Sequence, residues 1–301
     1  MESESCGWTW QLTGQPGGRV TVRNSMGAGN GQQVGRRHPG KGGVSMPSPI
    51  DFELSGKIAV ITGASRGIGE AIARGLAANG CDVVLASRKQ EGLDTVADSI
   101  NNEGAGRALP IACHTGNPDT VEALFERVVS DFGRLDILVN NAATNPFYGP
   151  AVEMPEWAFD KTIEVNVKGY FVTSQHAARL MLEQKSGSII NIASIAAMSP
   201  AHGQVVYGMT KAAVITMTKG LAKELGPGGI RVNAIAPGLV ETKFAGALIE
   251  DPEIQKHIEE FTPLGRHGQP EEIVGAALYL ASSVSSFNTG SVIVCDGGAI
   301  A

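Results

Sequence analysis

The feature that most constrains this chain is a regular alternation of short β-branched runs with helix-length segments, which begins at Lys57. Several runs are almost continuously apolar, as strands are when a parallel sheet is covered on both faces. Right-handed strand–helix–strand crossovers then predict an α/β fold, with one doubly wound domain, a seven-stranded parallel sheet and helices on both faces. The predicted strands are 57–62, 82–87, 107–112, 137–140, 187–192, 231–236 and 291–294. The predicted helices lie near 67–79, 90–103, 118–132, 156–183, 205–226 and 270–281.

Residues 1–50 differ from the rest of the chain in composition. They hold 11 of the 39 glycines and show no apolar periodicity. Such a segment buries too little surface to offset the entropy of ordering it. We therefore predict a disordered, Gly-rich N-terminal extension over 1–50, either vector-derived or translated from an upstream start, with Met46 as the natural first residue. Residues 51–301 are predicted to form the folded domain.

Composition excludes several classes of protein. The net charge of −6 argues against a general nucleic-acid binder or a protein of anionic membranes. No run approaches the roughly 20 apolar residues that cross a bilayer. The four cysteines are scattered, and the histidines form no HxH or HExxH set, so we expect reduced thiols, a cytoplasmic location and no metal.

A glycine-rich turn directly follows the first predicted strand and precedes a predicted helix. A backbone that approaches a pyrophosphate has no room for Cβ atoms, and the following helix N-terminus favours negative charge. A plain tight turn is the alternative, but the position between strand and helix favours a dinucleotide site in a Rossmann-type domain. The predicted cofactor-binding residues of this turn are Gly63, Ser65, Arg66, Gly67, Ile68 and Gly69.

The end of the second predicted strand indicates which dinucleotide binds. NAD-specific sites carry an acid here that binds the ribose hydroxyls, whereas this chain has Ser87 followed by Arg88 and Lys89. A guanidinium can bind a 2′-phosphate that a carboxylate would repel. We therefore predict NADP(H), bound by Ser87, Arg88 and Lys89 together with Arg66, although the two cations could simply be solvated residues at a helix start.

Further motifs occur in a fixed order along the chain. They are Asn140-Asn141-Ala142-Ala143, Asn166, Ser194, Tyr207-Gly208-Met209-Thr210-Lys211 and Pro237-Gly238. With the glycine turn, they resemble the short-chain dehydrogenase/reductase family over about 57–298. The resemblance implies a catalytic set of Asn166, Ser194, Tyr207 and Lys211. It also implies cofactor contacts from Asn140, Ala142, Tyr207, Lys211, Pro237, Gly238, Val240 and Thr242.

The catalytic set can also be argued from chemistry. Tyr207 and Lys211 are four residues apart on one predicted helix, so both side chains share a face. The Lys211 ammonium is expected to lower the Tyr207 pKa toward neutrality, where a proton donor works best. Ser194 can hydrogen-bond a substrate oxygen, and the resemblance assigns to Asn166 a carbonyl that orders a water near Lys211. Taken singly, Asn166 could be a helix irregularity and Ser194 a turn residue.

These inferences predict an NADPH-dependent oxidoreductase that transfers hydride between the nicotinamide and a ketone or secondary alcohol. The alternatives are a 3-oxoacyl-thioester reductase of fatty-acid synthesis and a non-catalytic NADP-binding sensor or scaffold. Many family members have an Asp after the third strand, where this chain reads Cys113-His114-Thr115-Gly116. That departure resembles a carbonyl-reductase branch of the family.

The remaining expectations concern partners and the substrate side. We expect a small-molecule ketone or alcohol substrate, with no nucleic acid and no membrane as partner. The segments 156–183 and 205–226 are apolar on more than one face, which favours a homodimer or homotetramer. A mobile lid is expected over 239–264. Residues expected to flank the active site are Phe147, Tyr148, His202, Gln204, Phe244 and Leu248.

Overall fold

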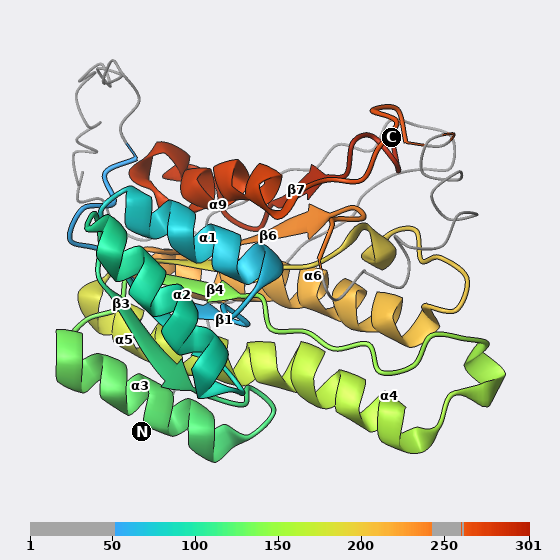
Figure 1. The fold of residues 1–301 in the computed structure, drawn as a ribbon, viewed down its shortest axis with the longest axis horizontal. Helices are drawn as coiled ribbons and strands as arrows, with labels where there is room; N and C mark the ends of the chain where they lie inside the picture. Colours follow the sequence, from blue (N-terminus) through green and yellow to red (C-terminus); the bar gives the residue numbers. More distant parts are fainter. Residues whose placement is uncertain (1–51, 243–259, 261) are drawn as a thin grey trace, which may run out of the picture. The chain divides into compact units, whose positions relative to one another are not determined.

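The computed structural model describes residues 52–242, 260 and 262–301, and it contains a parallel sheet of seven strands (Figure 1). The strand order is β3-β2-β1-β4-β5-β6-β7, so the predicted doubly wound architecture is confirmed. The predicted extension 1–50 and most of the predicted lid, 243–259 and 261, lie outside the described residues. The strands are β1 (Ile58–Thr62), β2 (Asp82–Ser87), β3 (Ala108–Ala112), β4 (Ile137–Asn140), β5 (Gly187–Ile192), β6 (Ile230–Pro237) and β7 (Val292–Cys295).

The helices agree with the prediction except at two places. The long segment predicted as one helix is α4 followed by a π-helical turn at Glu164–Lys168 and then α5, and the last helix is preceded by a 3-10 turn at Pro270–Ile273. The π turn carries Asn166, so a helix irregularity, which was the alternative interpretation of this residue, is present there. The helices are α1 (Gly67–Ala78), α2 (Gln90–Glu103), α3 (Pro118–Phe132), α4 (Glu156–Ile163), α5 (Gly169–Gln184), α6 (Val205–Leu225) and α9 (Val274–Ala281).

The apolar strands are explained by helices on both faces of the sheet. Ala59 and Ile61 of β1 face a core shared with α1, α2 and α9. The alternate residues of β1, Ile58 and Val60, face a second core shared with α3 and α5. Figure 1 shows the two helical layers above and below the sheet. Because successive side chains on a strand point to opposite faces, a strand buried on both sides has no polar position to alternate with.

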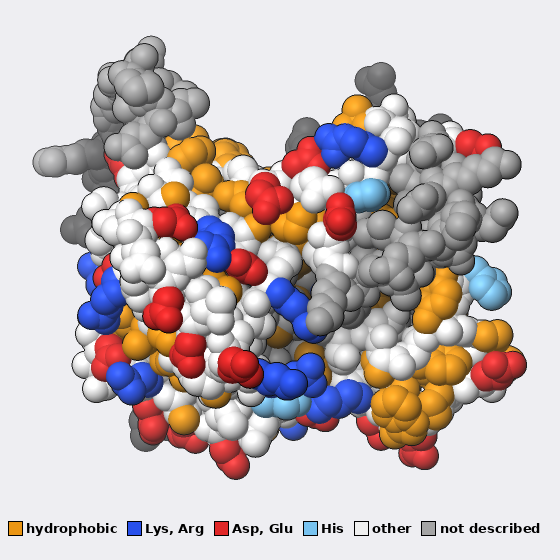
Figure 2. All heavy atoms as spheres, viewed as in Figure 1, with side chains coloured by type: hydrophobic (Ala, Val, Ile, Leu, Met, Phe, Trp, Pro, Cys, Tyr) orange, Lys and Arg blue, Asp and Glu red, His pale blue; other side chains and the backbone are white. Residues whose placement is uncertain are grey.

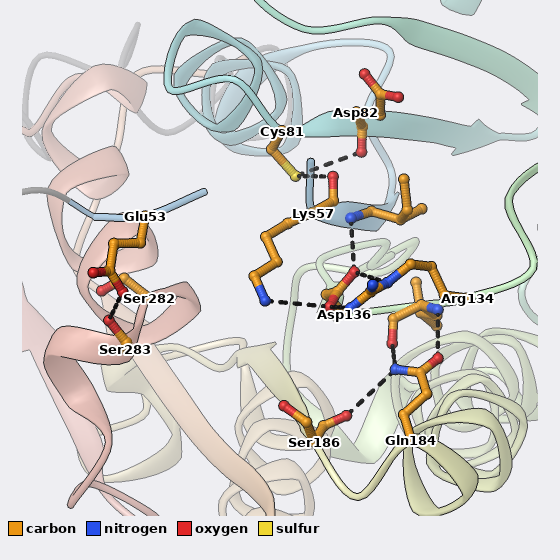
Figure 3. A network of polar contacts seen from close by, with 12 residues as sticks. Glu53, Lys57, Cys81, Asp82, Arg134, Asp136, Gln184, Ser186, Ser282 and Ser283 are labelled. Carbon is orange, nitrogen blue, oxygen red and sulfur yellow. Dashed lines mark hydrogen bonds and ion pairs between the residues drawn. The ribbon is translucent and has the colours of Figure 1, made fainter. Parts of the chain in front are cut away.

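A network of polar contacts links the amino ends of β1 and β4 (Figure 3). The Asp136 carboxylate, 7% exposed, accepts from the backbone N–H of Ile58 at 3.0 Å. The Arg134 guanidinium donates to both Asp136 oxygens, at 3.0 and 2.6 Å, and the Lys57 ammonium lies 3.6 Å away. The network fixes the start of β1 against the start of β4, two strands that pair in parallel.

The opposite edge of the sheet gathers the carboxyl ends of all seven strands. β1 lies between β2 and β4, so the chain reverses its direction of winding there. In such sheets a crevice opens beyond the strand ends at the point of reversal. The predicted glycine turn, Ser87, the Asn140 motif, Ser194 and Pro237 all follow or end strands at this edge.

Candidate active site

A cavity of about 940 Å³ lies at the carboxyl edge of the sheet. Sixteen of the predicted site residues line it, and three, Gly69, Asn140 and Asn166, do not. Of the predicted flanking residues, Tyr148, His202 and Gln204 line it as well. Phe147 lies outside it, while Phe244 and Leu248 are beyond the described residues. The sixteen are Gly63, Ser65, Arg66, Gly67, Ile68, Ser87, Arg88, Lys89, Ala142, Ser194, Tyr207, Lys211, Pro237, Gly238, Val240 and Thr242.

The glycine turn is shaped by close packing within the protein. A Cβ on Gly63 would lie 2.7 Å from Asn141 Nδ2, and one on Gly69 would lie 2.4 Å from the Gly63 carbonyl oxygen. Asn141 Nδ2 donates to the carbonyls of Thr62 and Gly63 at 3.0 and 3.2 Å. Gly63 and Gly67 also have positive φ values, 68° and 60°, which glycine adopts without strain. Glycine is therefore required by the turn itself, which leaves the N-terminus of α1 open to the cavity.

Three cations line the cavity near the end of β2. Arg66 is the N-cap of α1, and Arg88 and Lys89 follow β2 directly. All three are exposed, and none forms an ion pair or side-chain hydrogen bond with another residue in the described part of the chain. Cations at helix N-termini are poorly placed for helix stability. Their position on the cavity wall gives an anionic ligand three uncommitted partners.

Three of the four residues predicted to be catalytic also line the cavity. Ser194 follows β5, while Tyr207 and Lys211 share one face of α6. The Ser194 hydroxyl hydrogen-bonds the Tyr207 phenol, and Ser194 Oγ also accepts from the backbone N–H of Ala196 at 3.1 Å. The Lys211 ammonium, 1% exposed, donates to the Ile192 carbonyl at 2.7 Å and lies 5.7 Å from the centre of the Tyr207 ring.

Burial dominates the ionisation of this pair. It raises the pKa of Tyr207 to about 12, with the Ser194 hydrogen bond acting in the opposite direction. Burial also lowers the pKa of Lys211 to about 7. The expected lowering of the Tyr207 pKa toward neutrality is therefore wrong. The physical reason is that helical spacing fixes proximity, whereas desolvation disfavours both charged forms.

Asn166 is held by its side chain. Its Oδ1 accepts from the Thr144 backbone N–H at 2.8 Å, while its Nδ2 donates to the Thr144 carbonyl at 2.9 Å and to Thr210 Oγ1 at 3.1 Å. The side-chain carbonyl is thus engaged with the loop after β4.

Asn140 is placed in the protein interior. Its Nδ2 donates to Ser174 Oγ at 3.0 Å and Asn191 Oδ1 at 2.9 Å, and its Oδ1 accepts from the Thr173 hydroxyl at 2.6 Å. Its side chain is 1% exposed and does not reach the cavity. The neighbouring Asn141 does line it. Strand alternation explains the difference, because Asn140 is the last residue of β4 and points into the layer below the sheet.

Sequence reasoning missed two parts of the cavity wall. One is a basic pair: Lys161 Nζ lies 3.0 Å from His114 Nε2 and donates to Glu164 Oε1 at 3.0 Å. The other is the C-terminal turn, where Asp296 accepts from the backbone N–H groups of Gly298 and Ile300 at 2.9 and 3.0 Å. The unusual His114 after β3 was visible in the sequence, but its partner on α4 was not. No sequence pattern marked the C-terminal turn.

None of the helices within the described ranges is long and apolar enough to cross a membrane. Among those same residues, no group of three or more His, Cys, Asp or Glu side chains is placed to hold a metal ion.

Comparison with known proteins identifies the family. A family profile described as enoyl-(acyl carrier protein) reductase matches residues 63–299. The human dehydrogenase/reductase SDR family member 4 is 39% identical over 245 residues, which are 81% of this chain and 88% of the human protein. The 3-oxoacyl-acyl-carrier-protein reductase FabG of Aquifex aeolicus is 37% identical over 250 residues, 83% of this chain and 99% of that protein. The chain belongs to the short-chain dehydrogenase/reductase family of oxidoreductases.

Solved structures agree with this assignment. A short-chain type dehydrogenase/reductase from Mycobacterium marinum has a TM-score of 0.78 and 41% identity, over 83% of this chain and 98% of that one. A gluconate 5-dehydrogenase from Burkholderia cenocepacia, in complex with NADP and tartrate, has a TM-score of 0.80 and 35% identity, over 83% and 97%. A 7α-hydroxysteroid dehydrogenase complexed with NADH has a TM-score of 0.79 and 35% identity, over 82% and 96%.

Proposed function

We propose that this protein is an NADPH-dependent oxidoreductase that interconverts a ketone and a secondary alcohol. The observation that carries the proposal is the placement of Ser194, Tyr207 and Lys211 in one cavity with three uncommitted cations. Proton-transfer groups that line a cavity large enough for a dinucleotide are what a hydride-transfer enzyme needs.

The cavity suits a dinucleotide phosphate. The open N-terminus of α1 and the close-packed glycine turn form a cradle for a pyrophosphate. Arg66, Arg88 and Lys89 would hold an adenosine 2′-phosphate, and Val240 and Thr242 lie on the wall where the resemblance places the carboxamide of the nicotinamide. When bound, the nicotinamide supplies or accepts the hydride.

The chain's own residues handle the proton. In ketone reduction the Tyr207 phenol gives its proton to the carbonyl oxygen, and the Ser194 hydroxyl hydrogen-bonds that oxygen as negative charge develops on it. The Lys211 ammonium stabilises the phenolate left on Tyr207. Because burial raises the Tyr207 pKa to about 12, the phenol stays protonated at neutral pH, which suits the reductive direction.

The proposed preference for NADPH is argued from the residues at the end of β2 and not from the cofactors of similar proteins. The gluconate 5-dehydrogenase was solved with NADP and the 7α-hydroxysteroid dehydrogenase with NADH, so the fold accommodates both. In this chain Ser87 occupies the end of β2, and its hydroxyl donates to the Lys89 carbonyl at 3.5 Å. Position 87 therefore offers no carboxylate to the ribose of NADH, and Arg88 and Lys89 follow directly.

The second candidate is a 3-oxoacyl-thioester reductase, which uses the same chemistry on a larger substrate. The 37% identity to FabG supports this alternative. A non-catalytic NADP-binding sensor or scaffold would not need the hydrogen-bonded Ser194–Tyr207 pair, which disfavours it.

The test is loss of NADPH absorbance with a panel of ketones and with a 3-oxoacyl thioester. Turnover of simple ketones supports the proposal, turnover of the thioester alone supports the second candidate, and no turnover with retained NADPH binding supports the sensor. Tyr207→Phe should keep the NADPH dissociation constant and lower kcat by at least about 100-fold. A Phe variant that retains a tenth of wild-type turnover would show that Tyr207 is not the acid.

We further propose that the protein is a homodimer or homotetramer. Large apolar side chains are exposed on α4, α5 and α6, and Figure 2 shows apolar atoms gathered over α4. Trp157 is 63% exposed, Met209 51% and Phe171 44%. A surface of this kind is typical of an interface. Light scattering should report a mass at least twice that of the 31.3 kDa chain.

The described cysteines are all free thiols, which supports the proposed cytoplasmic location.

A further inference from the structure

A second tyrosine lies beside Lys211. Tyr170 of α5 is 1% exposed, and its hydroxyl donates to the Ile192 carbonyl at 3.1 Å. The Lys211 ammonium donates to the same carbonyl at 2.7 Å and to Tyr170 Oη at 3.4 Å. The ammonium nitrogen lies 5.2 Å from the centre of the Tyr170 ring and 5.7 Å from that of Tyr207. Lys211 is therefore held between two aromatic rings and two oxygens.

We propose that Tyr170 is a positioning residue of the reaction, whose hydroxyl and ring hold the Lys211 side chain and stabilise its positive charge. The proposal rests on the proposed function, because it assigns to Tyr170 an effect on the proton transfer of Tyr207. Tyr170 does not line the cavity, so it acts through Lys211 and not on the substrate.

The surroundings of Lys211 leave few other sources of stabilisation. No carboxylate pairs with it in the described part of the chain, and its side chain is fully buried. The titratable groups that face it are Tyr170 from α5 and Tyr207 from α6, with Ser194 bonded to the latter. A buried ammonium needs acceptors or ring faces to offset its desolvation. The Ile192 carbonyl and Tyr170 supply them.

Tyr170 is suited to this role because it does not ionise. Burial, with the nearby Tyr207, raises its pKa well above the usual value. Its hydroxyl therefore keeps one proton for the Ile192 carbonyl and one lone pair for the ammonium. Ionisable acceptors such as Asp would neutralise Lys211 more strongly but would also repel the phenolate that forms on Tyr207.

Removing the hydroxyl has a defined consequence. In Tyr170→Phe the ring stays and the acceptor is lost, so the Lys211 ammonium becomes less stable and its titration midpoint falls. A weaker positive charge stabilises the Tyr207 phenolate less. In alcohol oxidation, where Tyr207 accepts the proton, the rising limb of the rate profile should then move to higher pH.

The direct test is the titration of Lys211 by NMR in protein with ¹³C-labelled lysine, its signal assigned with Lys211→Met. Tyr170→Phe should lower the midpoint by about 0.5–1 pH unit. Tyr170→Leu, which also removes the ring, should lower it further. Tyr279→Phe is the matched control, because it deletes a tyrosine hydroxyl on α9, away from the cavity. An unchanged midpoint in Tyr170→Phe would overturn the proposal.

The second readout is the pH profile of kcat for alcohol oxidation with NADP⁺. Tyr170→Phe should move the rising limb up by about 0.5–1 pH unit, lower kcat at pH 7 about 3–10-fold and leave KM for NADP⁺ within about twofold. A loss of kcat that is equal at all pH values would indicate a merely structural role and refute the positioning. If the wild type shows no turnover, the proposed function fails, while the lysine titration still decides whether Tyr170 supports the charge of Lys211.

Discussion

The choice between NADPH and NADH can be tested by removing one cation at the end of β2. The perturbation is Arg88→Ile, combined in a second variant with Ser87→Asp. Arg88 lines the cavity and forms no ion pair with other described residues. Its removal therefore leaves no carboxylate unpaired, and the effect on cofactor binding is separate from any effect on folding.

The magnitude follows from the exposure of the site. A charge-assisted hydrogen bond to a phosphate contributes about 1.5–3 kcal/mol, but Arg88, Lys89 and Arg66 are all exposed, which places each near the lower end. Loss of Arg88 should thus weaken NADPH about 10–30-fold and leave NADH within about twofold. In the double variant, Asp at position 87 repels the 2′-phosphate and accepts hydrogen bonds from the NADH ribose, so the preference should reverse.

The assay is fluorescence titration of both reduced cofactors, which needs no knowledge of the substrate. Arg107→Ile is the matched control, since it removes the same charge just before β3, at the opposite edge of the sheet, where Arg107 stacks on Phe132. Raising the ionic strength from about 0.05 to 0.5 M should shrink the wild-type advantage of NADPH, because exposed charges are screened.

Two results would refute the reasoning. A wild-type protein that binds NADH more tightly would remove the cofactor assignment altogether. An Arg88→Ile variant that weakens both cofactors equally would show that Arg88 supports the fold of the β2–α2 turn rather than the 2′-phosphate. A double variant that still prefers NADPH would indicate that Arg66 is the main residue that binds the 2′-phosphate.

Three further predictions concern stability. Asp136→Ala should lower the free energy of unfolding by about 2–4 kcal/mol, because the Arg134 guanidinium and the Ile58 N–H lose their acceptor. Turnover of the folded enzyme should not change. Chemical denaturation measures the first effect and an activity assay the second. Gly69→Ala should cost about 1–3 kcal/mol by overpacking against the Gly63 carbonyl, whereas Gly220→Ala, with nothing within 4 Å, should be neutral or stabilising. Burial lowers the Lys211 pKa to about 7, so between about pH 7 and 10.5 the unfolded chain binds a proton at this lysine that the folded chain does not. The free energy of unfolding of the wild type, relative to Lys211→Met, should therefore rise by about 1.4 kcal/mol per pH unit over that window. Chemical denaturation at several pH values measures this difference, which would not change with pH if the folded protein kept the lysine charged.

The fold could be predicted from local patterns because the apolar runs and the turn residues both indicate the same helices and strands. The first four residues of β1 are apolar, and all five residues of the strand are buried in the structure. Turn residues bound the elements: Gly104 and Gly133 end α2 and α3 in left-handed conformations, and the Asn117 side chain caps α3. No local pattern indicates the π-helical form of the turn at Glu164–Lys168, in which Asn166 pairs with Thr144, 22 residues earlier in the chain.

Site residues that follow a strand could be predicted from the sequence. Site residues whose position depends on contact with another helix or strand could not. Arg88 and Ser194 lie at strand ends, and both line the cavity as expected. Asn140 was assigned to the cofactor, but the pleat of β4 turns it inward, and Asn141 faces the turn instead. The pairing of His114 with Lys161 joins the end of β3 to α4, a contact that only the assembled layers create.

Tyr207 and Lys211 show most clearly what spacing cannot supply. Four residues on a helix place the two side chains on one face, but the sign of each pKa shift is set by the solvent that the fold removes. With burial lowering the Lys211 pKa to about 7, the lysine titrates in the range where the enzyme would work, so small contributions decide how much of it is charged. The Ile192 carbonyl at 2.7 Å and Tyr170 Oη at 3.4 Å are such contributions. They come from β5 and α5, outside the helix that carries the motif. The proton chemistry of a Tyr–Lys pair is therefore set by the strand and helix that surround it as much as by the pair itself.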